Sequence, residues 1–165
     1  LNQAFLASID ALVAADVQVI WQTGKVYFGT ITTSLGTTCP PQIKVLEFLN
    51  RMDLAYAIAD VIVSRAGAGT IAELCLVKKP VILVPSPNVA EDHQTKNAQV
   101  LSQLNAAMLI TDKDAPHTLI TTCIELIKDT KKMSEMQEKL TQIAKPQATE
   151  TIANRIASFI EKANP

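Results

Sequence analysis

The chain has 165 residues, and its 15 basic and 16 acidic side chains give a net charge of −1. This charge excludes a general nucleic-acid binder, which needs a basic face for phosphates, and an aromatic content of 4% leaves too few rings for a base-stacking platform. A hydrophobic content of 48% excludes a disordered chain and predicts one domain with a large buried sheet.

Helix-like and strand-like hydrophobic patterns alternate along the chain. In chain order the predicted elements are a helix over 1–14, strands over 17–21 and 43–48, a helix over 50–59, a strand over 61–63, a helix over 70–77, a strand over 81–84, a helix over 93–104, a strand over 107–111, and helices over 116–128, 130–143 and 148–162. Residues 25–42 are rich in Thr and contain Pro40 and Pro41, so they predict a loop or a poorly formed helix. Asn50 or Asp53 is expected to cap the short helix after the second strand.

The strands over 61–63 and 81–84 are short, continuous and β-branched rather than alternating. Such strands are covered on both faces, as in a parallel sheet, and strand–helix alternation at this spacing indicates βαβ units with right-handed crossovers. The predicted fold class is therefore α/β, a Rossmann-like doubly wound parallel sheet. Because ligands of such sheets bind beyond the carboxyl ends of the strands, the candidate site loops are 48–53, 64–70 and 85–94.

The loop from Ser64 to Thr70 joins a buried strand to a helix and reads Ser-Arg-Ala-Gly-Ala-Gly-Thr. Its small residues let the backbone approach a ligand closely, and the N–H groups and dipole at the start of the next helix favour an anion such as a diphosphate. A tight strand-to-helix turn without any ligand has the same signature, and the stretch is neither a P-loop nor a GxGxxG motif. Both interpretations stay open on the residues alone.

Two further polar groups have a structural and a functional interpretation each. Glu73 follows Thr70 by three residues, which is the spacing of a capping box; alternatively, it is a carboxylate that binds a ribose diol one turn from the phosphate site. The run from Glu91 to Gln94 follows the fourth predicted strand. It either caps a helix through Asp92 or binds a hydroxyl-rich ligand.

The three cysteines, Cys39, Cys75 and Cys123, form no CxxC pair and predict neither a disulfide framework nor a zinc site. A reducing, cytosolic location is the simplest interpretation. No apolar run reaches the roughly 20 residues of a membrane-spanning helix, and no basic residue precedes Lys25, so no signal peptide is expected. The start at Leu1, within a helical pattern, is interpreted as part of a longer polypeptide.

Residues 52–74, which read MDLAYAIADVIVSRAGAGTIAEL, resemble the donor-site stretch of the MurG family, the bacterial peptidoglycan N-acetylglucosaminyltransferases. Residues 80–85 (PVILVP) and 93–98 (HQTKNA) continue the resemblance at the spacing of the family. Residues 1–3 resemble the helix after the family's inter-domain glycine-rich loop. The resemblance covers nearly the whole chain and is weakest over 25–42.

The resemblance implies the C-terminal, donor-binding lobe of a two-lobed GT-B glycosyltransferase, so that residues 1–165 form a single UDP-GlcNAc-binding domain. It implies that the full-length protein transfers GlcNAc from UDP-GlcNAc to the C4 hydroxyl of lipid I with inversion, which makes lipid II for peptidoglycan. The N-terminal lobe, which faces the acceptor and the cytoplasmic side of the inner membrane, would be absent together with the catalytic base. The isolated chain is therefore expected to bind donor without transferring sugar, and neither a metal, a cofactor nor a nucleic-acid partner is expected.

The resemblance also assigns the contacts of the donor. In the order uracil, diphosphate, ribose and sugar, the residues that would contact it are Phe48 and Leu49, then Arg65, Gly67, Ala68, Gly69 and Thr70, then Glu73, and finally His93 and Gln94 with Met52 nearby. Leu49 would act through its backbone, and Glu73 would bind both ribose hydroxyls. The N–H dipoles at the helix start would stabilise the departing UDP.

Two other functions remain alternatives. One is another GT-B enzyme that uses a UDP-sugar, such as a diacylglycerol glucosyltransferase or a UDP-GlcNAc 2-epimerase; the pair His93 and Gln94 favours GlcNAc transfer over it. The other is a non-catalytic nucleotide-binding subunit of a split GlcNAc transferase, whose catalytic partner is a separate chain. Such a subunit is expected to begin with its own first strand and glycine-rich loop, upstream of the pattern that starts at Leu1.

Overall fold

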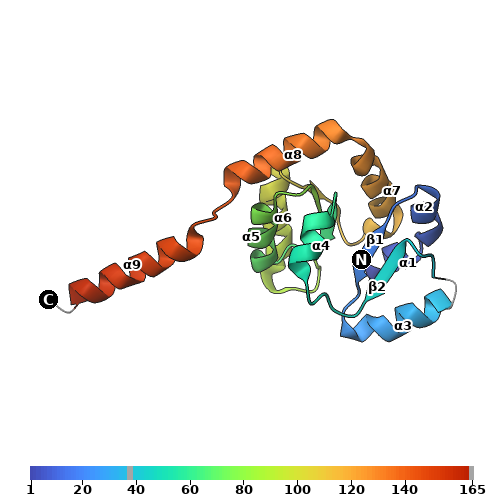
Figure 1. The fold of residues 1–165 in the computed structure, drawn as a ribbon, viewed down its shortest axis with the longest axis horizontal. Coiled ribbons are helices and arrows are strands. Elements are labelled where there is room, and N and C mark those ends of the chain that lie inside the picture. Colours follow the sequence, from blue (N-terminus) through green and yellow to red (C-terminus); the bar gives the residue numbers. More distant parts are fainter. Residues whose placement is uncertain (37–38, 164–165) are drawn as a thin grey trace.

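The computed structural model describes residues 1–36 and 39–163 (Figure 1). Its elements, in chain order, are α1 (Asn2–Leu6), α2 (Ile9–Ala14), β1 (Val19–Gln22), α3 (Lys25–Leu35), β2 (Ile43–Leu46), α4 (Met52–Ile58), β3 (Ile62–Ser64), α5 (Ala68–Val77), β4 (Val81–Leu83), the 3-10 turn η2 (Ala90–Asp92), α6 (His93–Gln103), β5 (Met108–Leu109), α7 (Ala115–Lys128), α8 (Thr130–Ile143) and α9 (Ala148–Ala163). Every predicted strand is present in this range.

The structure corrects two predictions about helices, one about the extent of a helix and one about a cap. The helix predicted over 1–14 is the pair α1 and α2, because the backbone leaves the helical region at Ser8, where φ is −125°. Neither Asn50 nor Asp53 caps α4: its N-cap position is Arg51, without a side-chain cap bond. The Asp53 carboxylate instead accepts two hydrogen bonds from the Arg51 guanidinium, at 2.9 and 2.7 Å, and this pairing lowers the pKa of Asp53.

The segment with the weakest sequence signal contains a regular helix, α3, over Lys25–Leu35. Its hydroxyl side chains bond back to the helix: Thr33 Oγ1 donates to the Gly29 carbonyl at 2.8 Å, and Ser34 Oγ donates to the Thr30 carbonyl at 2.9 Å. These bonds satisfy the hydroxyl groups within the helix, and the burial of Ile31 in the core stabilises α3 despite the poor helix propensity of Thr and Ser. Residues 37–38 of the predicted loop lie outside the described residues.

The strands form two parallel ladders, β1–β2 and β3–β4–β5. Val19 pairs with Ile43 in the first ladder, and Ile62 pairs with Val81 in the second. The parallel α/β architecture of the prediction is therefore confirmed, with the difference that the described strands hydrogen-bond as two sheets.

Two hydrophobic clusters hold the helices on these sheets. The larger cluster spans both sheets and lies under α1, α2 and α7; it includes Leu12, Trp21, Ile43, Ile82, Leu119 and Leu126. The second lies between β4 and the helices α5, α6 and α8, and it includes Leu74, Val81, Leu83, Leu101 and Leu140. All three residues of β4 are fully buried, as its continuous apolar sequence predicts.

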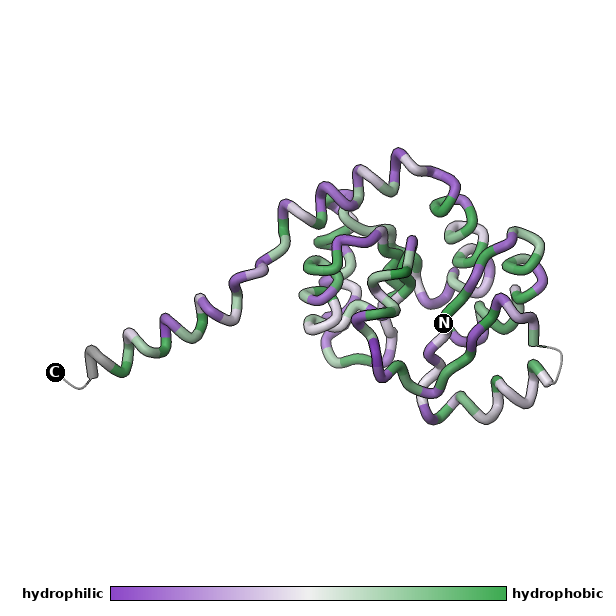
Figure 2. The backbone as a smooth tube through the Cα atoms, in the orientation of Figure 1, coloured by the Kyte–Doolittle hydropathy of each residue, from purple (hydrophilic) through white to green (hydrophobic). Residues whose placement is uncertain are grey.

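The last helix, α9, projects from the body beyond α8 (Figure 1), and green apolar segments recur along it in Figure 2. Ile152, Ile156, Phe159 and Ile160 of this helix are each more than half exposed. Over residues 1–36 and 39–163, the structure contains no helix with both the length and the apolar character that crossing a membrane requires.

Candidate functional site

The loops predicted to form the site lie at the carboxyl edge of the strands. Because the strands within each sheet are parallel, β1 and β2 end at the same edge of the first sheet. In the same way, β3, β4 and β5 end at the same edge of the second sheet. Residues 1 and 2 join the two edges: Asn2 Nδ2 donates to the Thr23 carbonyl after β1 at 3.0 Å, and the backbone nitrogen of Leu1 lies 3.8 Å from Asp112 Oδ1 after β5. The loops after β2, β3 and β4 therefore open on the same side of the molecule.

The glycine-rich turn ends in an uncapped helix start. α5 begins at Ala68, two residues earlier than predicted, because Gly67 takes an extended conformation at the N-cap position. The first intrahelical bond runs from the Ile71 N–H to the Gly67 carbonyl, so the N–H groups of Ala68, Gly69 and Thr70 have no partner within the helix. A Cβ added at Gly69 would meet no heavy atom within 4 Å. Ala68 and Gly69 are exposed, so the first turn of α5 lies at the surface with three backbone donors that have no helical partner.

Of the two interpretations of Thr70 and Glu73, the capping box is wrong, because the N-cap residue of α5 is Gly67 and no side chain caps it. Glu73 is exposed on the first turns of α5, and its Oε2 accepts a hydrogen bond from Tyr56 Oη of α4 at 3.3 Å. Burial, followed by the charge and the hydrogen bond of Glu73, raises the pKa of Tyr56. The carboxylate is therefore held between the first and second predicted loops.

Arg65, which follows β3, is hydrogen-bonded to the segments that follow β4 and β5. Its Nη1 donates to the carbonyls of Val84 and Pro85, at 3.1 and 3.0 Å, and pairs with Asp112 Oδ1 at 2.5 Å. These acceptors belong to the loops after β4 and β5, whereas Arg65 follows β3. A contact between Arg65 and a diphosphate stays a prediction; the bonds that the structure contains position the loops around the glycine-rich turn.

We expect Arg65→Met to lower the free energy of unfolding by about 1–3 kcal/mol, since two carbonyls and a carboxylate lose their donor. The ion pair itself contributes little, because both side chains are about a third exposed. Asp112→Asn, which removes the charge and keeps the carbonyl bonds, is therefore expected to cost less than half as much. Urea denaturation of both variants measures the difference, and equal losses would contradict the assignment of the main effect to the carbonyl bonds.

Two side chains of α6 hold the backbone of Ala66 in the glycine-rich turn. Gln94 Oε1 accepts from the N–H of Ala66 at 3.3 Å and from the N–H of Ser86 at 2.9 Å, and Asn97 Nδ2 donates to the Ala66 carbonyl at 3.0 Å. Since both partners of the Gln94 oxygen are donors, the amide orientation is fixed and its Nε2 is directed away from them. Gln94 therefore joins the second and third predicted loops and still carries a donor for a ligand.

The start of α6 has an unusual backbone. Glu91 and Asp92 have φ angles of 53° and 52°, in the left-handed region. Asp92 occupies the N-cap position, as predicted, but its Oδ1 accepts from Thr95 Oγ1 at 2.6 Å rather than from the helix backbone. His93 is exposed, and its Nδ1 lies 2.7 Å from the Ala90 carbonyl. A carbonyl only accepts, so Nδ1 is the protonated nitrogen, and in the neutral ring Nε2 is the acceptor that a sugar hydroxyl can meet.

We expect Glu91→Gly to raise the free energy of unfolding by about 0.5–1 kcal/mol, because glycine adopts the left-handed conformation without a steric penalty. Glu91→Ala removes the same carboxylate but keeps the Cβ, and it is expected to leave stability unchanged or lower. Thermal denaturation of the two variants makes the comparison. A glycine variant that is no more stable than the alanine variant would mean that the left-handed backbone at Glu91 carries no steric penalty.

The uracil end of the predicted site includes an internal hydrogen bond that the sequence does not reveal. The N–H of Leu49 donates to Gln22 Oε1 of β1 at 2.8 Å. A nucleobase donor would therefore use the Leu49 carbonyl, and a nucleobase acceptor would have to displace Gln22. Phe48 is 67% exposed beside this backbone, and Met52 opens α4 one turn further on.

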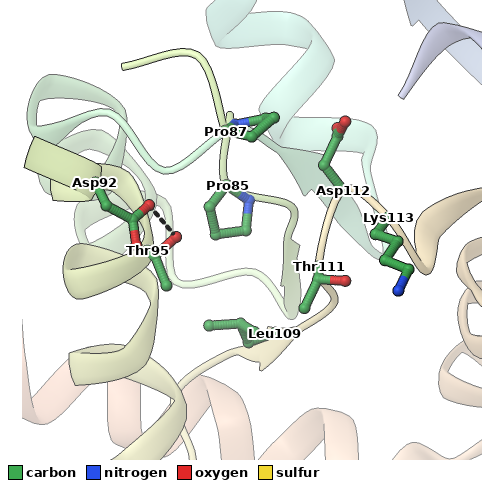
Figure 3. A pocket seen from close by; sticks show the side chains of 8 residues that line it. All are labelled: Pro85, Pro87, Asp92, Thr95, Leu109, Thr111, Asp112 and Lys113. Atoms are coloured by element: carbon green, nitrogen blue, oxygen red, sulfur yellow. Dashed lines mark hydrogen bonds between the residues drawn. The ribbon is translucent and has the colours of Figure 1, made fainter. Parts of the chain in front are cut away.

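A pocket of ≈ 340 Å³ adjoins the site at the ends of β4 and β5 (Figure 3). Figure 3 shows Asp92 and Thr95 on the left and Thr111, Asp112 and Lys113 on the right, with Pro87, Pro85 and Leu109 between them. Its lining includes Pro85, Pro87 and Asp92 of the predicted loop 85–94 but none of the predicted donor-contact residues. The structure thus adds the segment 109–113, with Asp112, to the surroundings of the site.

The cysteines and acidic residues add no further chemistry in the part of the chain that the structure describes. Burial raises the pKa of Cys75, and it raises that of Cys123 to about 12, so both thiols stay protonated. Residues 1–36 and 39–163 contain no group of three or more His, Cys, Asp or Glu side chains that could hold a metal ion.

Several positioning residues escaped the sequence analysis, although one signal was present. Asn97 stands in the HQTKNA stretch, one helical turn after His93, and its spacing places it on the face of α6 next to the glycine-rich turn. Tyr56, Gln22 and Asp112 carry no local signal, because their partners lie 17 to 47 residues away.

Comparison with known sequences identifies relatives along nearly the whole chain. The model of the glycosyltransferase family 28 C-terminal domain matches residues 1–155. The UDP-N-acetylglucosamine--N-acetylmuramyl-(pentapeptide) pyrophosphoryl-undecaprenol N-acetylglucosamine transferase of Porphyromonas gingivalis is 45% identical over 161 residues, which cover 98% of this chain and 42% of that protein. The protein of the same name from Parabacteroides distasonis is 41% identical over 162 residues, which cover 98% of this chain and 44% of that protein. The chain thus spans less than half the length of these relatives.

Solved structures give the same result for the fold. The crystal structure of Acinetobacter baumannii MurG matches with a TM-score of 0.71 and 26% identity, over 94% of this chain and 46% of that chain. The structure of a glycotransferase of kitacinnamycin matches with a TM-score of 0.68 and 22% identity, over 98% of this chain and 39% of that chain, which shows the fold alone. These matches confirm the resemblance drawn from residues 52–74 and the predicted fold class.

Proposed function

This chain belongs to the glycosyltransferase family 28 C-terminal domain family, and we propose on that ground that it is the donor-binding lobe of a transferase for GlcNAc. In this proposal the full-length protein moves GlcNAc from UDP-GlcNAc to undecaprenyl-diphospho-muramoylpentapeptide, so that lipid I becomes lipid II. The names of relatives at 41–45% identity support this acceptor and donor. Residues 1–165 supply the donor site, and the segment of the protein outside them supplies the acceptor contacts and the catalytic base.

The observation that carries the proposal is the uncapped start of α5 with Glu73 close by. The N–H groups of Ala68, Gly69 and Thr70 have no partner within the helix, and a diphosphate would accept from them. During transfer the bond between the sugar and the β-phosphate breaks, and negative charge develops on UDP. Fixed N–H dipoles at a helix start stabilise that charge without having to reorganise.

The other donor contacts follow from the groups left available by the internal bonds. Glu73, which Tyr56 holds through one oxygen, binds the ribose diol. The Leu49 carbonyl meets the uracil edge beside Phe48. The sugar hydroxyls lie between Gln94 Nε2 and His93 Nε2, near Met52, so one contact donates and the other accepts.

Arg65 acts in this proposal as a positioning residue. Its bonds to the loops after β4 and β5 fix the position of the glycine-rich turn relative to residues 85–94. The acceptor is a lipid, so the full-length protein works at the cytoplasmic face of the bacterial inner membrane as a peripheral enzyme. Another GT-B enzyme that uses a UDP-sugar, and a nucleotide-binding subunit with a separate catalytic chain, are the alternatives.

The test is a transfer assay in which labelled UDP-GlcNAc and labelled UDP-glucose are each supplied in parallel with a lipid I analogue. We expect the full-length protein to form lipid II and the 165-residue chain alone to form none, because an inverting transfer needs an acceptor hydroxyl placed about 3–3.5 Å from the anomeric carbon and a base within reach of it. Transfer of glucose in preference to GlcNAc would favour the first alternative. Turnover by the 165-residue chain would contradict the proposal that the base lies outside it.

A further inference from the structure

Gln22, the last residue of β1, contacts the loop that binds the base in the proposed function. It is paired with Leu46, the last residue of β2, and the pairing continues beyond both strands, because the Gly24 N–H donates to the Glu47 carbonyl at 3.2 Å. The exposed side chain of Gln22 reaches Leu49, and its Oε1 accepts from the Leu49 N–H at 2.8 Å. The loop after β2 is thus bonded to the end of β1 through this side chain.

This hydrogen bond fixes the orientation of the Gln22 carboxamide. Because the Leu49 N–H is a donor, the carboxamide oxygen lies next to it, and the Nε2 donor lies on the other branch of the carboxamide. Neither Nε2 of Gln22 nor the carbonyl of Leu49 has a hydrogen-bond partner within residues 1–36 and 39–163. Gln22 therefore occupies one of the two backbone groups of Leu49 and leaves the other free.

The carboxamide of Gln22 has the same hydrogen-bonding pattern as the imide edge of uracil. In both groups a carbonyl is bonded directly to a nitrogen that carries a hydrogen, so an acceptor and a donor lie side by side. The N–H and the carbonyl of Leu49 are complementary to such a pair. When the N3–H of uracil donates to the Leu49 carbonyl, the adjacent uracil oxygen needs the N–H that Gln22 occupies. The base and the Gln22 side chain therefore require the same donor.

We propose that Gln22 is an internal competitor of the base: its carboxamide is bonded to Leu49 in the nucleotide-free protein, and uracil displaces it on binding. This inference rests on the proposed function, in which the backbone of Leu49 meets the uracil edge. Only the fraction of molecules in which Gln22 has released Leu49 is competent to bind the base fully, and the apparent dissociation constant rises accordingly. Since one neutral hydrogen bond is broken, the competition should weaken UDP binding roughly twofold to tenfold.

The competition acts on the product as well as on the donor, because UDP and UDP-GlcNAc carry the same base. As uracil leaves, the Gln22 carboxamide can return to the Leu49 N–H, and that donor regains a protein partner. Product release limits turnover in many transferases and other enzymes with mobile loops. Gln22 therefore favours the release of UDP after transfer, at the expense of affinity for the donor.

Calorimetric titration of the full-length protein with UDP tests the proposal. We expect Gln22→Ala and Gln22→Met to bind UDP roughly twofold to tenfold more tightly than the parent, because the Leu49 N–H is then unoccupied. Alanine removes the side chain, whereas methionine keeps its length without a carboxamide, so a gain shared by both does not come from new packing. Gln18→Met, at an exposed glutamine just before β1, is the matched control and should leave the affinity unchanged.

The amide resonance of Leu49 provides a second readout. Without nucleotide, the Leu49 N–H of the parent should exchange with solvent more slowly than that of Gln22→Met, which lacks the acceptor. With saturating UDP the two exchange rates should become equal, because uracil then accepts from this N–H in both proteins. The side-chain amide resonances of Gln22 should shift at the same time, as the carboxamide leaves Leu49.

Two outcomes would overturn the proposal while the proposed function stands. The first is a parent that binds UDP and variants at Gln22 that bind it equally or more weakly, since a competitor cannot increase affinity. The second is a side-chain amide of Gln22 whose resonances do not change at saturating UDP. A parent protein that binds no UDP would instead contradict the proposed function, and the role of Gln22 would fall with it.

Discussion

Glu73→Gln is expected to weaken the binding of UDP by about tenfold to a hundredfold. A hydrogen bond to a charged group contributes about 1.5–3 kcal/mol, and in the proposed site the carboxylate accepts from both ribose hydroxyls. The helix start does not depend on Glu73, because Gly67 occupies the N-cap position of α5 without a side-chain cap. The stability of the variant should therefore stay within about 0.5 kcal/mol of the parent, as for other exposed positions.

Two controls separate ribose binding from the contact with Tyr56. Tyr56→Phe removes the 3.3 Å bond to Glu73 and keeps the carboxylate, so it should reduce UDP affinity much less than Glu73→Gln. Calorimetric titration with UDP and 2′-deoxy-UDP completes the test. An undiminished preference for UDP over 2′-deoxy-UDP in Glu73→Gln would mean that the carboxylate does not hold the ribose.

Gln94→Glu is expected to separate the two roles of this side chain. A carboxylate oxygen still accepts from the N–H groups of Ala66 and Ser86, so the loops stay joined and stability is preserved. The amide donor is lost and a negative charge is added, so affinity for UDP-GlcNAc should fall by tenfold or more, about 1.4 kcal/mol or above, as expected for the loss of a donor to the sugar with added repulsion of the diphosphate.

Gln94→Leu is the matched variant for the structural role. It leaves both backbone N–H groups without their acceptor, and we expect the free energy of unfolding to fall by about 1–3 kcal/mol. Urea denaturation and titration with UDP-GlcNAc on both variants give a two-way comparison. A glutamate variant that is as unstable as the leucine variant would contradict the assignment of Oε1 to the backbone bonds.

Local patterns sufficed for the strands and for most helices. The continuous apolar run of β4 predicted a strand buried on both faces, and its three residues are fully buried. The segment that contains the helix over Lys25–Leu35 was predicted only as a loop or a poorly formed helix, because hydroxyl residues lower helix propensity on average. The packing of Ile31 in the core stabilises the helix, and this tertiary contact has no local sequence signal. The capping box at Thr70 matched a real sequence pattern, but the extended backbone of Gly67 moved the helix start by two residues.

The site could be predicted as a set of loops but not as a network. The rule that ligands lie beyond the carboxyl ends of parallel strands selected all three loops. The bonds that shape them are long-range: Arg65 reaches Asp112 across 47 residues, and Leu49 reaches Gln22 across 27. From the sequence alone Arg65 is interpreted as a cation that can bind a phosphate, because its carbonyl acceptors, Val84 and Pro85, lie 19 and 20 residues away in the chain.

The central claim is that the carboxyl edge around α5 binds the nucleotide sugar, and its most direct test is an amide chemical-shift titration of the 165-residue chain. UDP-GlcNAc, UDP-glucose, UDP and ATP are added in parallel. We predict that the uridine diphosphates shift the resonances of residues 48–52, 64–73 and 92–97, with a weaker response to ATP. An equal response to ATP and UDP, or shifts confined to residues outside these three segments, would contradict the assignment of this edge as the donor site.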